Sequence, residues 1–178
     1  MKKSVSGFTI VELLIVIVVI GILAAITIVA YNGVQNRASD TSVQSDLRNI
    51  AKQLEVGRVD STTDSYPTNN TTLAAVVNIK VNKNSYAVAP NAGYNLLLCF
   101  PTTANPSEYI ILAQSKSGKK FYLRNSGAIT EYTGATSWSG GVASTLCDSV
   151  VTGWTASGAG YASSDTTSGP WRSWAGGN

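Results

Sequence analysis

A lone carboxylic acid interrupts the apolar run near the start of the chain. Between Phe8 and Tyr31, Glu12 is the only side chain that is charged at neutral pH, and no basic residue occurs between Lys3 and Arg37. A carboxylate at the depth of a lipid bilayer is costly and needs a partner. Cleavage of the chain just before Phe8 would create an α-amine that supplies the missing positive charge. Phe8 of one molecule would then neutralise Glu12 of another, so the pair predicts an assembly device.

Simpler interpretations of the same segment remain open. A secretory signal peptide also has a basic start and an apolar run, and Ala24-Ala25 offers a small-residue cleavage site for it. A plain anchor fits too, because the run is about 20 residues and a bilayer core is roughly 30 Å thick. Neither interpretation gives a role to Glu12 or to Gly7-Phe8. A further alternative is that Glu12 pairs only with the start of its own helix, where the helix dipole favours negative charge.

Residues 1–56 resemble the class III signal and N-terminal helix of type IV pilins and the related pseudopilins. The residues that carry this resemblance are Lys2, Lys3, Gly7, Phe8, Glu12, Gly21 and Tyr31. The resemblance implies cleavage after Gly7 by a prepilin peptidase, N-methylation of Phe8, and assembly of identical subunits into a helical homopolymer. It also implies a separate assembly machinery driven by an ATPase, a stage in membrane lipid before assembly, and no cofactor. Val29 stands where many members have a proline.

Composition limits the other classes of function. The chain has 178 residues, which suffices for one membrane segment and one domain of about 120 residues. It contains no histidine, so zinc sites and histidine-dependent triads lack their usual residues. Neither paired acids at a helpful spacing nor a phosphate-binding glycine loop is recognisable, so we expect a protein that is not an enzyme and holds no metal. The formal charge of +3 is too small to indicate nucleic acid by itself.

The two basic residues at the start also predict the orientation. Because basic residues stay on the cytoplasmic side, Lys2 and Lys3 place the N-terminus inside and the bulk of the chain outside a cytoplasmic (inner) membrane that it crosses once. The assembled filament would then be extracellular.

The only two cysteines, Cys99 and Cys147, fall in the part expected outside the membrane, where disulfides persist. A bond between them would close a loop of nearly fifty residues and contribute roughly 4 kcal/mol in the chain-entropy model. Two free buried thiols and a metal pair are the alternatives. In the resembling family a C-terminal disulfide commonly fastens a terminal loop to the sheet.

We expect an α+β fold with a long N-terminal helix packed on a small antiparallel sheet. Residues 1–7 form the leader, 8–31 the membrane or filament-core half of the helix, 32–57 its amphipathic half, and 58–178 the globular head. In the amphipathic half the apolar residues Val43, Leu47, Ile50 and Leu54 recur at helical spacing, and Gly57 is the expected C-cap. A coiled-coil dimer competes, although the stripe covers only about two heptads.

The strand signals lie between residues 94 and 132. Apolar or alternating runs at 94–100, 109–113, 120–124 and 128–132, separated by short turns, predict an antiparallel meander. The amphipathic helix half is available to cover one face. A short helix is expected at 73–78, after two Asn-x-Thr sequons that start at Asn69 and Asn70.

The final third is rich in Gly, Ser and Thr, and it also holds every tryptophan of the chain: Trp138, Trp154, Trp171 and Trp174. Disordered tails usually lack aromatic residues, so we expect this segment to pack on the sheet. A sugar-binding or adhesive surface is the alternative, because flat rings offer a large contact area.

A basic cluster falls on the second predicted hairpin. Its members are Lys116, Lys119, Lys120 and Arg124. On a filament surface these side chains could attract DNA phosphates or another anionic surface, whereas an ordinary solvated loop is the simpler interpretation.

Together these observations predict a structural subunit of a type IV pilus-like filament. The alternatives are a minor pilin or pseudopilin of a DNA-uptake or type II secretion system, and a membrane-anchored surface adhesin. The cysteine pair favours a pilus, since the resemblance implies that the main pseudopilins lack such a bridge and bind calcium near the C-terminus, where this chain has few acids.

Overall fold

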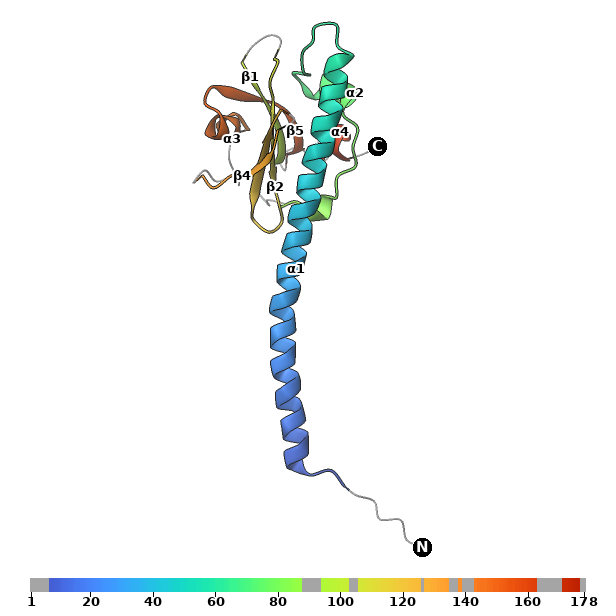
Figure 1. The fold of residues 1–178 in the computed structure, drawn as a ribbon, viewed down its shortest axis with the longest axis vertical. Coiled ribbons are helices and arrows are strands. Elements are labelled where there is room, and N and C mark those ends of the chain that lie inside the picture. The colour runs from blue at the N-terminus through green and yellow to red at the C-terminus, as the bar shows by residue number, and fades with distance from the viewer. Residues whose placement is uncertain are drawn as a thin grey trace. The chain divides into compact units, whose positions relative to one another are not determined.

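The computed structural model describes residues 7–87, 94–102, 106–125, 127–134, 138, 143–162 and 171–176. The chain divides into two compact units, Met1–Arg37 and Ala38–Asn178. Helix α1, Ile10–Val59, belongs to both, and it is a single helix as the sequence predicts (Figure 1).

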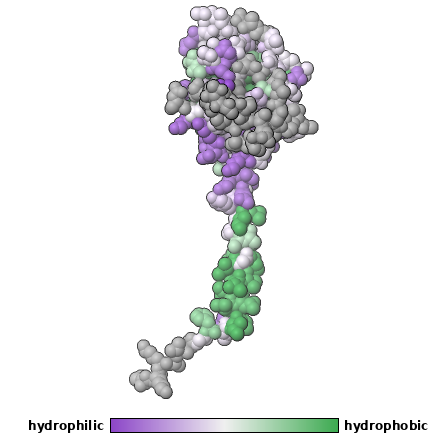
Figure 2. Space-filling model, turned by 180° about the vertical axis from the view of Figure 1, so that it is seen from behind, coloured by the Kyte–Doolittle hydropathy of each residue, from purple (hydrophilic) through white to green (hydrophobic). Residues whose placement is uncertain are grey.

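The first unit consists of the apolar half of α1 and the residues before it. From Phe8 to Val34 the large hydrophobic side chains are between 48% and 90% exposed. Figure 2 shows this part of the helix as a continuous hydrophobic surface. Within the described residues, α1 is the one helix that is long and apolar enough to cross a membrane. Within the described residues these side chains are not covered, and a helix that is apolar on every side is expected to be surrounded by lipid or by other helices.

The second unit contains a five-stranded antiparallel sheet in the order β4-β3-β2-β1-β5. The predicted meander is confirmed. It consists of β1 Tyr94–Pro101, β2 Ile110–Gln114, β3 Lys120–Arg124 and β4 Ile129–Glu131.

A fifth strand, β5 Trp154–Ala162, was not expected. It pairs antiparallel with β1 and carries register shifts along its length. Gly158 of this strand faces α2, where an added Cβ would lie 2.7 Å from Leu73 Cδ2. The absence of a side chain at Gly158 therefore lets the neighbouring helix approach the strand closely.

Each face of the sheet has its own core, because alternate residues of a strand point to opposite sides. On one face, Leu96, Leu98 and Phe100 of β1 pack with the predicted apolar stripe of α1, from Val43 to Leu54. On the other face, Leu97 and Cys99 pack with Trp138, Trp154 and helix α3, Ala143–Val150. In Figure 1, α1 and α3 accordingly lie on opposite sides of the sheet.

Short helices complete the head. They are α2 Asn70–Val76, the 3-10 helix η1 Lys83–Ser85 and α4 Ser173–Gly176. Helix α2 begins three residues earlier than expected, because the Asn69 side chain accepts a bond from the Thr72 N–H and forms a capping box. The other sequon asparagine, Asn70, accepts a hydrogen bond from Trp174 Nε1 at 3.4 Å. Both sequon asparagines thus have structural roles.

The expectation that Gly57 ends the first helix is wrong. Helix α1 continues through Gly57 to Val59. An added Cβ at Gly57 would overlap the Val76 side chain of α2. The glycine is therefore explained by close packing inside the head, and a left-handed C-cap is not needed.

Candidate functional site

The predicted processing residues precede the first turn of α1. Gly7 and Phe8 are exposed, and Phe8 retains 90% of its accessible surface. A Cβ added at Gly7 would meet nothing within 4 Å. Among the described residues, none therefore limits the size of a side chain at Gly7, and cleavage after it stays a prediction.

Glu12 has a partner inside its own subunit. The backbone N–H of Thr9 and the Thr9 hydroxyl both donate to Glu12 Oε2, at 2.8 and 2.6 Å, and the Glu12 N–H donates to Thr9 Oγ1 at 3.2 Å. This is the reciprocal pattern of a capping box at the start of α1. The alternative in which Glu12 bonds to the start of its own helix thus describes the single subunit, and its pairing with Phe8 of another copy stays a prediction.

Thr9 is the residue of this site that sequence reasoning missed. The signal was present, since Thr9-Ile-Val-Glu12 followed by an apolar run matches the capping-box pattern. Both donors of Thr9 bond the same oxygen, Oε2. Within the described residues, Oε1 of Glu12 therefore keeps its lone pairs for a further donor.

Cys99 and Cys147 form the predicted disulfide, with an S–S distance of 2.06 Å. Both cysteines are fully buried, and the bond joins β1 to α3 inside the second core. It holds the outer layer of the head against the sheet.

The basic cluster on the β2–β3 hairpin is partly neutralised. Lys119 Nζ lies 2.9 Å from Glu131 Oε2, and Arg124 Nη2 lies 2.9 Å from Glu108 Oε1. Lys120 Nζ lies 5.8 Å from the centre of the Tyr132 ring and 5.9 Å from that of Trp138. Lys116 is exposed. DNA binding by these four residues stays a prediction, but two of the four cations already have an acid beside them.

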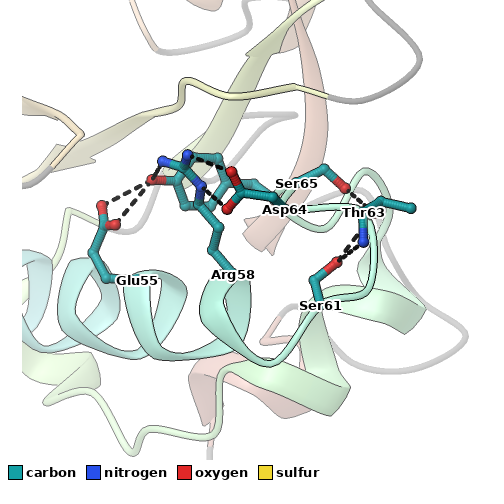
Figure 3. Close-up of polar contacts among 7 residues, drawn as sticks. Glu55, Arg58, Ser61, Thr63, Asp64 and Ser65 are labelled. Atoms are coloured by element: carbon teal, nitrogen blue, oxygen red, sulfur yellow. Dashed lines mark hydrogen bonds and ion pairs between the residues drawn. The ribbon is translucent and has the colours of Figure 1, made fainter.

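A polar cluster at the end of α1 fastens the following loop to the head (Figure 3). Glu55 accepts hydrogen bonds from the hydroxyls of Tyr66, at 2.9 and 3.0 Å, and of Tyr109, at 3.2 Å. Arg58 binds both oxygens of Asp64, at 2.9 and 3.1 Å. Burial raises the pKa of Tyr66, whereas the Arg58 guanidinium holds the pKa of Asp64 below its ordinary value. The cluster keeps the chain direction fixed as it leaves the helix.

The other acids in the head half of α1 also accept hydrogen bonds from side chains of the head. Asp46 Oδ2 accepts a hydrogen bond from Tyr86 at 3.0 Å, and Asp40 accepts one from the Ser117 hydroxyl. Burial raises the pKa of Asp46 and also that of Tyr86. The carboxylates of this half therefore bind side chains of the head.

Most of the tryptophans are core residues. Trp138 and Trp174 are each 1% exposed and Trp154 is 8% exposed. Trp171 is half-buried and makes an edge contact with Tyr86 at a ring separation of 5.3 Å. This arrangement confirms the packing interpretation for the described part of the C-terminal third.

Comparison with known proteins finds similarity to a described family and to several relatives. The family described as "Prokaryotic N-terminal methylation motif" matches residues 2–28. The chain is 28% identical over 119 residues to the type II secretion system core protein G of Dickeya chrysanthemi, and the match covers 67% of this chain and 75% of that protein. It is 38% identical over 74 residues to the type IV wide pilus major component PilA4 of Thermus thermophilus, covering 42% of this chain and 55% of that protein.

A further relative is the core protein G of Pseudomonas aeruginosa, which is 28% identical over 109 residues, 61% of this chain and 75% of that protein. No solved structure matches the chain with statistical significance. The motif, these relatives and the long apolar helix packed on an antiparallel sheet agree with one another. These findings support the type IV pilin family, and the chain is a pilin-like subunit.

Proposed function

We propose that this protein is a structural subunit of a type IV pilus-like cell-surface filament. The observation that carries the proposal is the exposed apolar half of α1, whose first turn holds Glu12 bonded to Thr9 and which overlaps the N-terminal methylation motif at residues 2–28. Before assembly this half crosses the inner membrane once, with the N-terminus inside, and in the filament it is covered by the same helix of other copies. The exchange of lipid for sister helices leaves the head folded.

The chemistry of assembly centres on one charge pair. A prepilin peptidase cuts after Gly7, and the new terminus at Phe8 is methylated. The Phe8 amine of one copy then approaches Glu12 of a neighbour, whose Oε1 is open while Oε2 stays on Thr9. Because a filament core excludes water, an unpaired carboxylate there would be strongly unfavourable, and the amine removes that penalty.

The test has two parts. N-terminal mass spectrometry of the mature protein should find N-methyl-Phe8, and Glu12→Ala should leave cleaved protein in the membrane with no filaments in sheared cell-surface material. Glu12→Asp is the matched control, since it keeps the charge. Filaments at the normal yield from Glu12→Ala cells would contradict the assembly role. Recovery of the protein with Met1 intact, from a host that has the peptidase, would contradict the whole proposal.

A second candidate is a pseudopilin of a type II secretion system. It is favoured by the relatives of that name, which match this chain over a longer stretch than the pilus component does. The two functions use the same subunit chemistry and differ in filament length and in the machinery that holds the subunit. Deletion of the gene separates them, because loss of surface filaments with normal protein secretion supports the pilus, and the reverse result supports the secretion system.

A further inference from the structure

The start of α1 leaves the peptide bond between Gly7 and Phe8 outside the helix. Helix α1 begins at Ile10, and the Leu13 N–H donates to the Thr9 carbonyl at 3.3 Å. Gly7, Phe8 and Thr9 are not helical. Thr9 is therefore the N-cap residue, since its carbonyl accepts the first bond of the helix. A helix that began one or two residues earlier would take in the 7–8 bond.

The Thr9 hydroxyl stands in for a backbone carbonyl. In an α-helix each N–H donates to the carbonyl four residues earlier, so the ordinary acceptor for the Glu12 N–H would be the Phe8 carbonyl. The Glu12 N–H instead donates to Thr9 Oγ1 at 3.2 Å, and the Thr9 N–H donates to Glu12 Oε2 at 2.8 Å. Among the described residues, no backbone bond joins Glu12 to Phe8 or Val11 to Gly7. The capping box therefore competes with extension of the helix upstream.

This competition has its largest effect in lipid. A backbone N–H without an acceptor is strongly unfavourable in hydrocarbon, so a helix without a cap gains by extending toward its N-terminus. Such an extension would bond the Gly7 carbonyl to the Val11 N–H. Hydrolysis of the 7–8 bond adds the hydroxyl of water to the Gly7 carbonyl carbon and its proton to the Phe8 nitrogen. A carbonyl oxygen that is bonded within a helix is less available to the donors with which an enzyme stabilises the charge that develops on it.

We propose that the Thr9–Glu12 box keeps the Gly7 carbonyl outside the helix, and that the Thr9 hydroxyl is thereby a positioning residue for cleavage of the 7–8 bond. This inference rests on the proposed processing by a prepilin peptidase. It is supported by the 90% exposure of Phe8 and by the methylation motif at residues 2–28, which directs enzymes to this terminus. Glu12 then acts twice, through Oε2 before cleavage and through Oε1 in assembly.

The test measures cleavage of the full-length precursor by a prepilin peptidase in micelles of detergent and lipid. Thr9→Val keeps the shape of the side chain and removes the hydroxyl, whereas Thr9→Ser keeps the hydroxyl and should restore cleavage. Thr27→Val is the matched control, because the Thr27 hydroxyl donates to the Ala24 carbonyl, away from the start of the helix. Initial rates at several precursor concentrations, read by mass spectrometry, give kcat and KM separately.

We expect kcat/KM to fall about threefold in Thr9→Val, because the start of the helix is no longer fixed and a share of the precursor encloses the 7–8 bond. The change should lie in KM, since the precursor that does bind has the same exposed bond. Thr9→Ser and Thr27→Val should stay within about 1.5-fold of wild type. The ¹³C signal of the Gly7 carbonyl should move toward its helical position in Thr9→Val alone.

Three results would overturn the inference and leave the proposed function standing. One is equal kcat/KM for wild type and Thr9→Val. Another is a Thr9→Ser precursor that is cleaved as slowly as Thr9→Val, since the hydroxyl would then not be the group that matters. The third is slow cleavage of Thr9→Val with an unchanged Gly7 carbonyl signal, which would show that the peptidase contacts the side chain directly. A wild-type precursor that the peptidase does not cleave would instead contradict both the processing and this inference.

Discussion

The two halves of α1 have the same backbone conformation and opposite relations to their own subunit. In the half up to Arg37, the large apolar side chains are exposed on every side of the helix. In the half from Ala38 onward, Val43, Leu47, Ile50 and Leu54 are completely buried against the sheet. Acids in that half bind tyrosine or serine hydroxyls of the head. One half of the helix therefore contributes to the folded head, whereas we propose that the other half serves association, and substitutions should separate the two roles.

The largest effect on stability should come from the disulfide. Cys99→Ser with Cys147→Ser should lower the free energy of unfolding of the head by about 4 kcal/mol. Without the disulfide the unfolded chain regains the conformational entropy that the closed loop between the two cysteines removes. All tryptophans lie in the head, so urea unfolding followed by tryptophan fluorescence reports on it alone. Membrane insertion of the first half should be unchanged. Unfolding that matches wild type would show that packing alone holds α3 in place.

A pair of matched substitutions tests the comparison directly. Leu47→Ala removes a fully buried side chain and should destabilise the head by about 3 kcal/mol. Ile17→Ala removes a side chain that is 59% exposed, so it should change the unfolding of the head by less than about 0.5 kcal/mol. Filament yield should fall for Ile17→Ala despite the stable head. A head equally destabilised by both substitutions would break the division between the halves.

Thr9→Val tests the capping box at the start of the exposed half. The change keeps the shape of the side chain and removes the hydroxyl, and we expect a loss of about 1 kcal/mol at the first turn. Faster hydrogen exchange of the Glu12 amide in micelles would measure it. Thr27→Val is the control, because the bond that the described structure shows for the Thr27 hydroxyl goes to the Ala24 carbonyl, away from the start of the helix. Unchanged exchange in Thr9→Val would argue against the box.

The smallest expected effect is a pH dependence in the buried half. Burial raises the pKa of Asp46, so the native state holds this proton more tightly than the unfolded chain does. As pH rises from about 3 to about 7, ionisation of Asp46 should therefore lower the free energy of unfolding of the wild-type head. In Asp46→Asn this contribution to the pH dependence should be absent. Urea unfolding at several pH values would show the difference in stability between variant and wild type growing with pH. A constant difference would contradict the role of burial.

Periodicity in the sequence was sufficient for much of this fold. Core-facing residues recur at helical or strand spacing, so burial could be predicted from the sequence for the stripe from Val43 to Leu54 and for the runs at 94–100, 109–113 and 120–124. Strand β5 has no such signal: its small residues are placed by pairing with β1 and by the approach of Leu73. Such a strand is defined by its neighbours and not by its own composition.

The polar contacts were the hardest part to predict. Arg124 meets Glu108 because the β2–β3 register sets Ile110 opposite Arg124, and nothing in the basic cluster itself indicates that acid. Glu55 meets Tyr66 and Tyr109 only after the loop turns back and the sheet forms. Thr9 is different, since its bond to Glu12 is local and follows a known pattern. Polar contacts between residues close in sequence can thus be predicted from a sequence, whereas those that depend on the tertiary structure cannot.

The pairing of β1 with β5 has a consequence for how the head is made. Tyr94 pairs with Ala162 and Pro101 with Trp154, so β1 can complete its pairing only after residues more than fifty positions later have been synthesised. Contacts this distant in sequence slow folding, because a long loop must close before they can form. Until β5 is available, β1 therefore has one edge whose backbone N–H and C=O groups lack their partners in the sheet.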